Sequence, residues 1–145
     1  YNFRFSNIQA VLGLSQLNSL DDNVAKRKEI NQFYQDLFQD SKGIKVFKET
    51  SNVYQSNHWL TCILIDEKLA GFSRIDLQRK FNEEKIETRF LWKPMHLQPI
   101  FKKLDYYGNK VAENLFTQGL CLPSGSNLTE EDRNRISTAL SFFLT

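Results

Sequence analysis

The sequence has little of what a metal site, a nucleic-acid interface or a membrane span requires. Only two histidines and two cysteines occur among its 145 residues, and a histidine–cysteine metal centre would need more ligands close together. The formal net charge is only +2, which is too small to favour a nucleic-acid partner. No apolar run approaches the length of a membrane span. We therefore expect no bound metal, no nucleic-acid partner and no membrane partner.

The scarcity of cysteine also bears on the cellular compartment. Cys62 and Cys121 each lie in a short apolar run, so we expect two free, buried thiols rather than a disulfide scaffold. Such thiols fit a reducing cytoplasm, and no signal peptide is visible. The chain starts without methionine, at Tyr1, inside a motif-like stretch. We therefore expect it to be a fragment of a longer protein.

What the sequence does contain is typical of a single soluble domain over residues 1–145. Apolar residues make up 41% of the chain and charged residues 25%, which are ordinary values for a globular protein. The length suffices for one hydrophobic core. Twelve Phe, five Tyr and two Trp indicate either a ring-rich core or rings that are buried against another surface.

Apolar periodicity and capping residues predict a mixed fold. Helical spacing predicts a long amphipathic helix from Ile8 to about Phe38, or two helices with a bend. The strand predicted at residues 58–65 is apolar on both faces, which places it centrally in a covered sheet. The whole pattern predicts a small α/β (α+β) domain with a mostly antiparallel sheet packed against helices. The other predicted elements are strands near residues 44–47 and 86–90, and helices at 74–83 (burying Ile75, Leu77 and Phe81), at 110–118 and after Thr129.

The first nine residues place polar and aromatic side chains ahead of a marked helix start. Ser6 is a favourable N-cap, and Gln9 stands where a capping-box partner belongs. Unpaired amides at a helix N-terminus attract anions, and Asn2 and Arg4 add donors nearby. The stretch is a candidate phosphate site, while the residues alone favour Asn2 and Arg4 as polar turn residues before a helix.

A loop that carries side chains suited to binding is predicted at residues 92–99. Two prolines exclude regular structure there, and loops with Trp, Met and His are frequent binding sites. Trp92 and Met95 could line a ligand-binding site or pack on a core. His96 could contact a substrate or make a structural hydrogen bond. Arg89, just before the loop, is expected to form a surface ion pair rather than a phosphate site.

Three blocks of sequence resemble the DegT/DnrJ/EryC1/StrS aminotransferases, which use pyridoxal 5′-phosphate (PLP) to aminate nucleotide-linked keto sugars. The opening Tyr-Asn-Phe-Arg-Phe-Ser-Asn-Ile-Gln resembles the start of that family's C-terminal region. Trp-Lys-Pro-Met-His-Leu-Gln-Pro resembles its Pro-x-His-x-x-Pro segment and is most similar to the branch that makes 4-amino sugars of the bacillosamine type. Leu122-Pro123 followed by Leu128-Thr129-Glu130-Glu131 resembles its closing block. The blocks follow the family's order over essentially the whole chain.

The resemblance implies the C-terminal small domain of a fold-type I aminotransferase, together with its linking helix. The family holds PLP as a Schiff base on a lysine of a larger N-terminal domain, and no lysine here lies in that motif. No catalytic residue is therefore expected in this chain, which alone should be inactive. The implied reaction transfers nitrogen from glutamate to a nucleotide-linked 4-keto sugar, in a cytoplasmic homodimer that makes polysaccharide or glycan precursors.

The resemblance also implies roles for individual residues. Asn2 and Arg4 match positions that contact the PLP phosphate of the partner subunit. The positions that it implies for substrate binding are Tyr1, Trp92, Met95 and His96. Two alternatives stay open: a non-catalytic binding or oligomerisation module, and a family member with dehydratase chemistry in which histidine replaces the PLP lysine.

Overall fold

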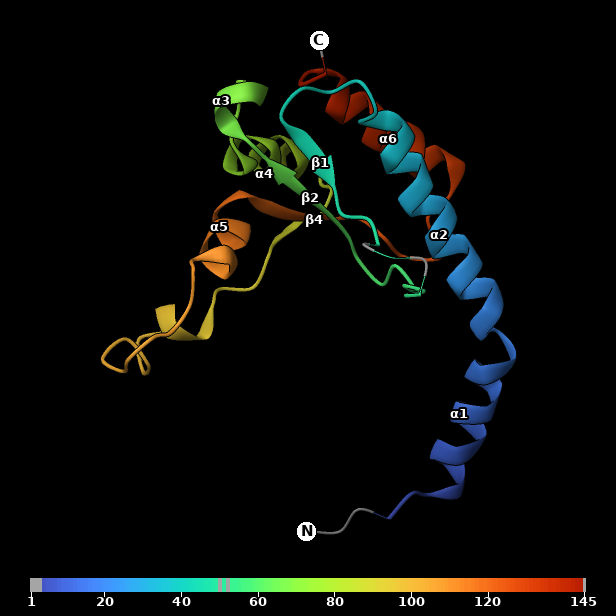
Figure 1. Cartoon of the computed structure of the whole chain (residues 1–145). Helices are drawn as coiled ribbons and strands as arrows, with labels where there is room; N and C mark the ends of the chain where they lie inside the picture. Colours follow the sequence, from blue (N-terminus) through green and yellow to red (C-terminus); the bar gives the residue numbers. More distant parts are fainter. Residues whose placement is uncertain (1–3, 50, 52, 145) are drawn as a thin grey trace.

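The computed structural model describes residues 4–49, 51 and 53–144 and shows a four-stranded sheet flanked by helices (Figure 1). The strand order is β1-β2-β4-β3, and every neighbouring pair is antiparallel. The predicted mixed fold with a small antiparallel sheet is confirmed. The elements are α1 (Asn7–Asn18), α2 (Leu20–Leu37), β1 (Ile44–Val46), β2 (Thr61–Ile65), α3 (Glu67–Ala70), α4 (Arg74–Glu83), β3 (Arg89–Phe90), the 3-10 helix η1 (Met95–Leu97), α5 (Val111–Gln118), β4 (Gly119–Leu122) and α6 (Glu130–Ser141).

Two short strands form the centre of the sheet. β2 pairs with β1 on one side and with β4 on the other, so its predicted central position is confirmed. The apolar pattern did not indicate β4, because four consecutive apolar residues show no period. All four residues of β4 are buried. Its register sets Ile63 opposite Leu120 and Cys62 opposite Cys121.

The hydrophobic core lies on one face of this sheet. Ile63 and Leu120 are completely buried there, and helices α2, α4 and α6 pack over them. Burial of each aliphatic side chain stabilises the fold by about 1.5–3 kcal/mol. The helix residues in this core are Ile30, Tyr34, Phe81, Leu77, Ile136, Ala139 and Leu140, with Phe38 at the end of α2.

A chain of buried hydrogen bonds joins α2 to the central strands. The amide of Asn31 donates to Thr61 Oγ1 at 3.2 Å, and the Thr61 N–H donates to Ser124 Oγ at 2.8 Å. The Ser124 hydroxyl donates in turn to the Leu122 carbonyl at 2.8 Å. Tyr34 donates its hydroxyl to the Pro123 carbonyl at 2.9 Å, and burial raises the pKa of this phenol. These buried polar groups therefore have the partners that burial demands.

The long N-terminal helix is two helices with a bend, the second of the two predicted forms. α1 ends and α2 begins at Ser19, whose N–H and hydroxyl both donate hydrogen bonds to the Gln16 carbonyl oxygen. Asp21 and Asp22 follow in the first turn of α2, where negative charge favours a helix start. No residue of α1 is buried. Of the helices that the structure describes, none combines the length and apolar character needed to cross a lipid bilayer.

Two strands are shorter than their apolar patterns predict. β2 begins at Thr61 rather than at residue 58, because His58 has a φ of 46°, which an extended strand does not accept. The His58 Nε2 atom lies 3.5 Å from the Glu49 carboxylate. β3 retains only residues 89 and 90, because Lys85 has a φ of 57° and the Ile86 N–H still bonds to the end of α4.

Two burial predictions are wrong. Ile75 is 52% exposed, because the buried stripe of α4 consists of Leu77 and Phe81, one turn apart. Cys62 is only half-buried, since alternate residues of β2 point away from the core. β2 was predicted to be buried on both faces, but it is fully buried on one face only.

Gly119 begins β4 at a point where Leu91 and Leu115 both lie close to its Cα atom. A Cβ atom there would lie 2.6 Å from the Leu115 carbonyl oxygen and would overlap the Leu91 side chain. We expect Gly119→Ala to lower the free energy of unfolding by about 1–3 kcal/mol, as over-packing does, when measured by urea denaturation. Gly13→Ala is the matched control, because nothing lies within 4 Å of its Cβ position and alanine favours a helix interior. Equal stability of the two variants would contradict the close packing at Gly119.

Candidate functional site

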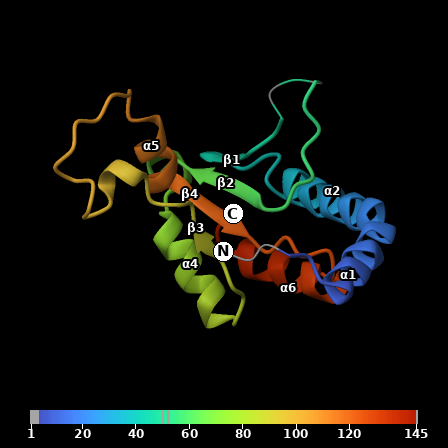
Figure 2. The same cartoon turned by 90° about the horizontal axis from the view of Figure 1, so that it is seen from below.

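The loop residues predicted to bind substrate lie on a long segment between β3 and β4, residues 91–118, which we call the excursion. β3 and β4 are adjacent and antiparallel, with Phe90 opposite Leu120, so the chain leaves the sheet and returns at nearly the same place. Figures 1 and 2 both show the excursion extending from the side of the sheet away from α1. The loop predicted at residues 92–99 is confirmed, with η1 as the one helical element in this stretch of the described residues.

Arg74, the first residue of α4, fastens the base of the excursion. Its guanidinium carbon lies 4.1 Å from the ring centroid of Phe90 and 4.8 Å from that of Phe116, so the cation contacts two aromatic faces. The guanidinium also donates to the carbonyl oxygens of Phe116 and Gly119. Burial lowers the pKa of Arg74, yet a guanidinium stays charged at neutral pH. One side chain thus holds both ends of the excursion against α4.

His96 is held inside the excursion by two contacts. Its Nε2 atom lies 2.9 Å from Glu113 Oε1 on α5, and its ring stacks on Tyr106 with centroids 3.7 Å apart. A carboxylate only accepts hydrogen bonds, so Nε2 carries the hydrogen and Nδ1 of the neutral ring is left as an acceptor. The side chains of His96 and Glu113 are 18% and 27% exposed. The structural hydrogen bond that the sequence left open is therefore present.

Trp92 and Met95 do not pack into the core of this chain. Trp92 is 87% exposed and Met95 is 65% exposed. This rules out packing on the core, one of the two predicted uses of these side chains, in favour of a surface that can contact something else. Further apolar side chains of the excursion are similarly exposed, namely Ile100, Leu104 and Tyr107.

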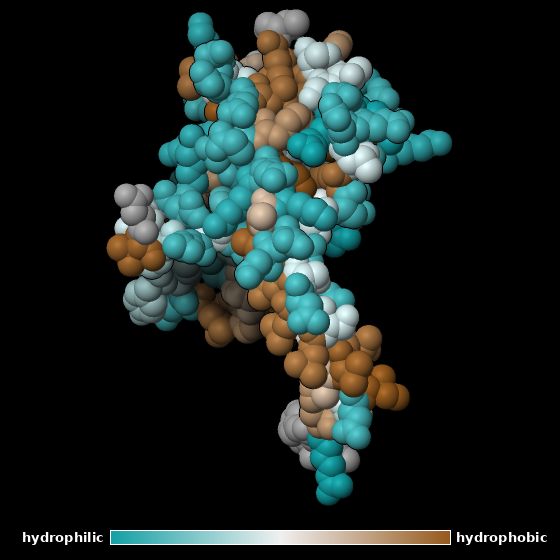
Figure 3. Space-filling model, turned by 90° about the vertical axis from the view of Figure 1, so that its right-hand side faces the viewer, coloured by the Kyte–Doolittle hydropathy of each residue, from teal (hydrophilic) through white to brown (hydrophobic). Residues whose placement is uncertain are grey.

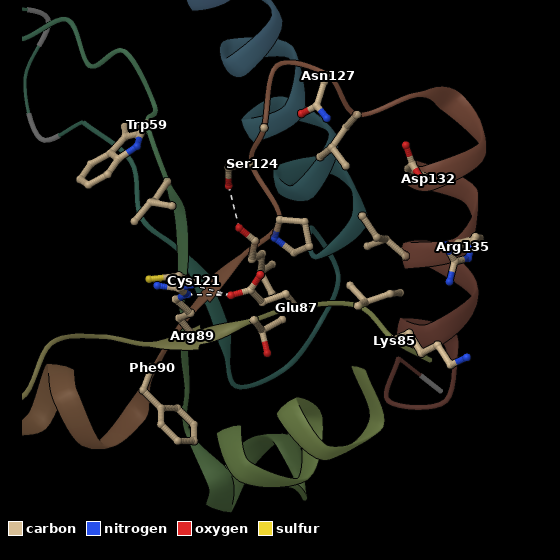
Figure 4. Close-up of a pocket in the computed structure, with 18 of the residues that line it drawn as sticks. Trp59, Lys85, Glu87, Arg89, Phe90, Cys121, Ser124, Asn127, Asp132 and Arg135 are labelled. Carbon is tan, nitrogen blue, oxygen red and sulfur yellow. Dashed lines mark hydrogen bonds and ion pairs between the residues drawn. The ribbon is translucent and has the colours of Figure 1, made fainter. Parts of the chain in front are cut away.

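A cavity of about 610 Å³ opens beside β3 and the end of β4. Figure 4 shows Arg89 and Cys121 from the sheet on one side of this space and Arg135 from α6 on the other. The Arg89 guanidinium lies 2.7 Å from the Glu87 carboxylate, and both side chains are exposed, which confirms the predicted surface ion pair. Trp92 also borders the cavity, so the cavity and the excursion adjoin.

Nothing in the sequence pattern indicates this cavity. Its lining comes from the segment before β2, from β3, from the chain after β4 and from α6, which are far apart in sequence and share no spacing. The aromatic Trp59, at 60% exposure, is one lining residue that pattern reasoning assigned to a buried strand. Among the described residues, no group of three or more His, Cys, Asp or Glu is arranged to hold a metal ion.

The predicted phosphate site lies at the start of α1, apart from the excursion. Ser6 Oγ accepts from the Gln9 N–H at 3.2 Å, and Gln9 Oε1 accepts from the Ser6 N–H at 2.9 Å, so the predicted capping box is confirmed. Arg4 is exposed, and Tyr1 and Asn2 lie outside the described residues. Figure 1 shows the start of α1 and the excursion on different sides of the molecule. Within one chain, the structure does not bring these two predicted sites together.

The fold of this chain is shared with solved aminotransferases. Over 99% of this chain and 38% of the other, the structure superposes with a TM-score of 0.81 and 26% identity on Helicobacter pylori PseC, an aminotransferase involved in pseudoaminic acid biosynthesis. A DegT DnrJ EryC1 StrS aminotransferase from Brucella abortus gives a TM-score of 0.79 and 26% identity over 97% of this chain and 36% of that one. The fold is that of fold-type I aminotransferases.

The chain belongs to the DegT/DnrJ/EryC1/StrS aminotransferase family, whose sequence pattern it matches over residues 1–141. It is 40% identical over 144 residues to Bacillus subtilis EpsN, which is assigned by name as a pyridoxal phosphate-dependent aminotransferase. That match covers 97% of this chain and 36% of EpsN. It is also 30% identical over 143 residues to the GDP-perosamine synthase of Escherichia coli O157:H7, covering 99% of this chain and 37% of the synthase. The chain thus spans somewhat more than a third of the length of these relatives.

Removal of the Glu113 carboxylate should loosen the excursion. We expect Glu113→Ala to speed tryptic cleavage after Lys102 or Lys103 about fivefold, because loss of a hydrogen bond worth about 1 kcal/mol raises the open population by that factor. Glu29→Ala is the control, because this exposed carboxylate on α2 has no hydrogen-bond partner in the described part of the chain. Unchanged cleavage in Glu113→Ala would mean that Glu113 does not hold His96 in place.

Proposed function

We propose that this chain is the C-terminal part of a PLP-dependent aminotransferase that moves an amino group from glutamate to a nucleotide-linked 4-keto sugar. The enzyme would act as a cytoplasmic homodimer in the synthesis of polysaccharide or glycan precursors. The observation that carries the proposal is the family match over residues 1–141. The relatives' names support the substrate class: one is GDP-perosamine synthase, and a Campylobacter jejuni relative, 26% identical over 141 residues, is UDP-4-amino-4,6-dideoxy-N-acetyl-beta-L-altrosamine transaminase.

The described residues fit one part of a PLP site, the phosphate contact. Arg4 offers a guanidinium that suits phosphate oxygens, and α1 begins beside it with a helix N-terminus that favours an anion. We assign Asn2 to the same phosphate, in the partner subunit's site. When bound, PLP supplies an electron sink for nitrogen transfer.

The same residues offer no environment for the lysine that holds the cofactor. Every described lysine is exposed except Lys80, and Lys80 is engaged in an ion pair with Glu84 at 2.8 Å. A lysine that forms a covalent bond to PLP needs to be desolvated and largely uncharged when it reacts. We therefore assign that lysine, and with it the catalytic step, to the remainder of a longer protein.

We assign substrate contacts to Tyr1 and to the excursion residues Trp92, Met95 and His96. His96 presents Nδ1 as an acceptor, because Glu113 fixes the hydrogen on Nε2. A sugar or ribose hydroxyl is a suitable donor to that nitrogen. The exposed ring of Trp92 and the flexible thioether of Met95 suit the apolar faces of a sugar or a base.

The surface of α1 supports an assembly in which this helix is covered. Figure 3 shows apolar surface gathered on the segment that projects from the body of the molecule. Exposed apolar patches on soluble proteins mark surfaces that another chain or domain normally covers. The apolar residues of α1 that are 60–75% exposed are Ile8, Val11, Leu12, Leu14 and Leu17. We infer that α1 packs against the larger domain and the second subunit.

The isolated chain of 145 residues should neither attach PLP covalently nor transfer nitrogen, because the lysine is assigned elsewhere. The measurement compares the isolated chain with the full-length protein, by the absorbance of lysine-bound PLP and by amination of a nucleotide-linked 4-keto sugar with glutamate. Activity of the isolated chain would contradict the assignment of the lysine. In the full-length protein, sugar dehydration without amination would favour the dehydratase, and absence of both reactions would favour the binding module.

Asn2 provides a sharper test in the full-length enzyme. Asn2→Ala removes one hydrogen bond to a charged group, worth roughly 1.5–3 kcal/mol, which corresponds to about a ten- to hundred-fold loss of PLP affinity. Activity should partly return at high PLP concentration. Asn2→Asp should bind PLP more weakly still, because it sets a carboxylate against a phosphate. Asn18→Ala, at the other end of α1, is the control that should keep normal affinity.

Subunit mixing tests whether Asn2 acts across the dimer. One inactive parent lacks the PLP lysine and the other carries Asn2→Ala. A mixed dimer holds one site with both groups intact and one site with neither, so activity at low PLP should recover on subunit exchange. A mixture that stays as inactive as its parents, despite demonstrated exchange, would show that Asn2 does not contact the partner's cofactor.

A further inference from the structure

Two cysteines face each other across the central pair of strands. Cys62 on β2 is directly opposite Cys121 on β4, and their sulfur atoms lie 3.6 Å apart. Both thiols are free. The proposed amination uses neither thiol. The fold nevertheless brings the two together although they are 59 positions apart in the sequence.

The backbone at this pair has the geometry that a cross-strand disulfide needs. The Cys62 carbonyl accepts from the Phe47 N–H at 2.9 Å, and the Thr61 N–H points the other way, to Ser124 Oγ. In an antiparallel strand both polar groups of one residue point to the same side, so Cys62 and Cys121 form a non-hydrogen-bonded pair. Such pairs have Cα atoms about 4.5 Å apart, inside the roughly 4.4–6.8 Å range of disulfides. Rotation of the side chains alone could then bring the sulfur atoms to a bonding distance of about 2.05 Å.

The hydrogen bond between the two sulfur atoms shifts the pKa values of the two thiols in opposite directions. When the Cys62 thiol donates to the Cys121 sulfur, this hydrogen bond lowers the pKa of Cys121, although burial opposes the shift. The same hydrogen bond and burial raise the pKa of Cys62. A lowered pKa increases the thiolate fraction of Cys121, and the thiolate is the nucleophile in sulfur exchange.

A small reagent can reach this pair from the cavity described above. Cys121 lines that cavity of about 610 Å³, and Figure 4 shows its sulfur beside Arg89, which is opposite Cys121 on β3. Cys62 is itself only half-buried. The site therefore combines a thiolate, a second thiol within reach and an opening to solvent.

We propose that Cys62 and Cys121 are a modification site, a cross-strand dithiol that low-molecular-weight disulfides convert reversibly into an intramolecular disulfide. The Cys121 thiolate attacks one sulfur of the reagent RSSR, which forms a mixed disulfide and releases RS⁻. Cys62 loses its proton and attacks the Cys121 sulfur, which releases the second RS⁻. The two released thiolates take up the two protons, so the protein loses two protons and two electrons and RSSR becomes two RSH. Intracellular dithiols that oxidise in this way are usually transient and redox-sensing.

The test treats the full-length, PLP-loaded enzyme with one equivalent of 2,2′-dithiodipyridine, followed by alkylation and peptide mass spectrometry without reduction. We expect a cross-linked pair of peptides that contains Cys62 and Cys121, two equivalents of thiopyridone released for that pair, and full reversal by dithiothreitol. Oxidation should also raise the urea midpoint, because a disulfide that closes a long loop constrains the unfolded chain. Denatured protein treated in the same way shows how the two cysteines react when nothing pre-aligns them.

Single substitutions provide matched controls. In Cys62→Ala and in Cys121→Ala the remaining cysteine has no partner, so any pyridyl group that it acquires should persist and the urea midpoint should not rise. Alanine is small and apolar, which suits both positions, and circular dichroism checks that each variant folds. A wild-type enzyme that keeps a stable pyridyl mixed disulfide on either cysteine, or whose two thiols stay unmodified while the denatured protein reacts, would overturn the proposal.

Discussion

The pairing of β2 with β4 is the constraint on which the rest of the structure depends. Ile63 and Leu120 meet across these strands with no exposed surface, and the three core helices close over them. β4 is only four residues long, so it is stable as a strand only because it has a partner on each side. Residues distant in sequence must therefore meet before the core can form, and the entropy of closing that loop is offset by the burial of these apolar side chains.

This pairing also decides where the excursion can be. Because β3 lies against the other side of β4, the segment between them starts and ends at one point of the sheet and has to project from it. Arg74 secures that point with a charged group on two aromatic rings. Farther along the excursion, the contacts of His96 with Glu113 and Tyr106 join its first and second halves. The excursion is thus held at its base by Arg74 and within itself by one hydrogen-bonded, stacked imidazole.

Sequence reasoning recovered the parts of the structure that local chemistry determines. The capping box predicted at Ser6 forms, and boxes of the same kind form at Ser73 and Thr129, because a cap needs only residues three positions apart. It missed β4 and overextended the strand that begins at Thr61, because pairing partners and the φ of His58 are set by tertiary contacts. The loop that carries the candidate site was predicted from its prolines and unusual side chains. The cavity, the contacts of Arg74 and the contact of Glu113 with His96 could not be predicted, because each joins segments that are distant in sequence and share no periodic pattern.

The two candidate sites differ from the core in one physical respect: each leaves apolar or aromatic side chains uncovered. The face of α1 is apolar but uncovered, and the excursion exposes Trp92 and Met95 beside a well-positioned histidine. The contacts of Arg74 and His96 order a loop that adds nothing to the core of this chain. Such ordering is expected where the loop binds another domain or subunit, because a rigid loop loses little entropy when its partner binds. The proposed dithiol is likewise separate from the core, since Cys62 and Cys121 lie on the sheet face away from the core helices, where formation of a disulfide does not require these helices to repack.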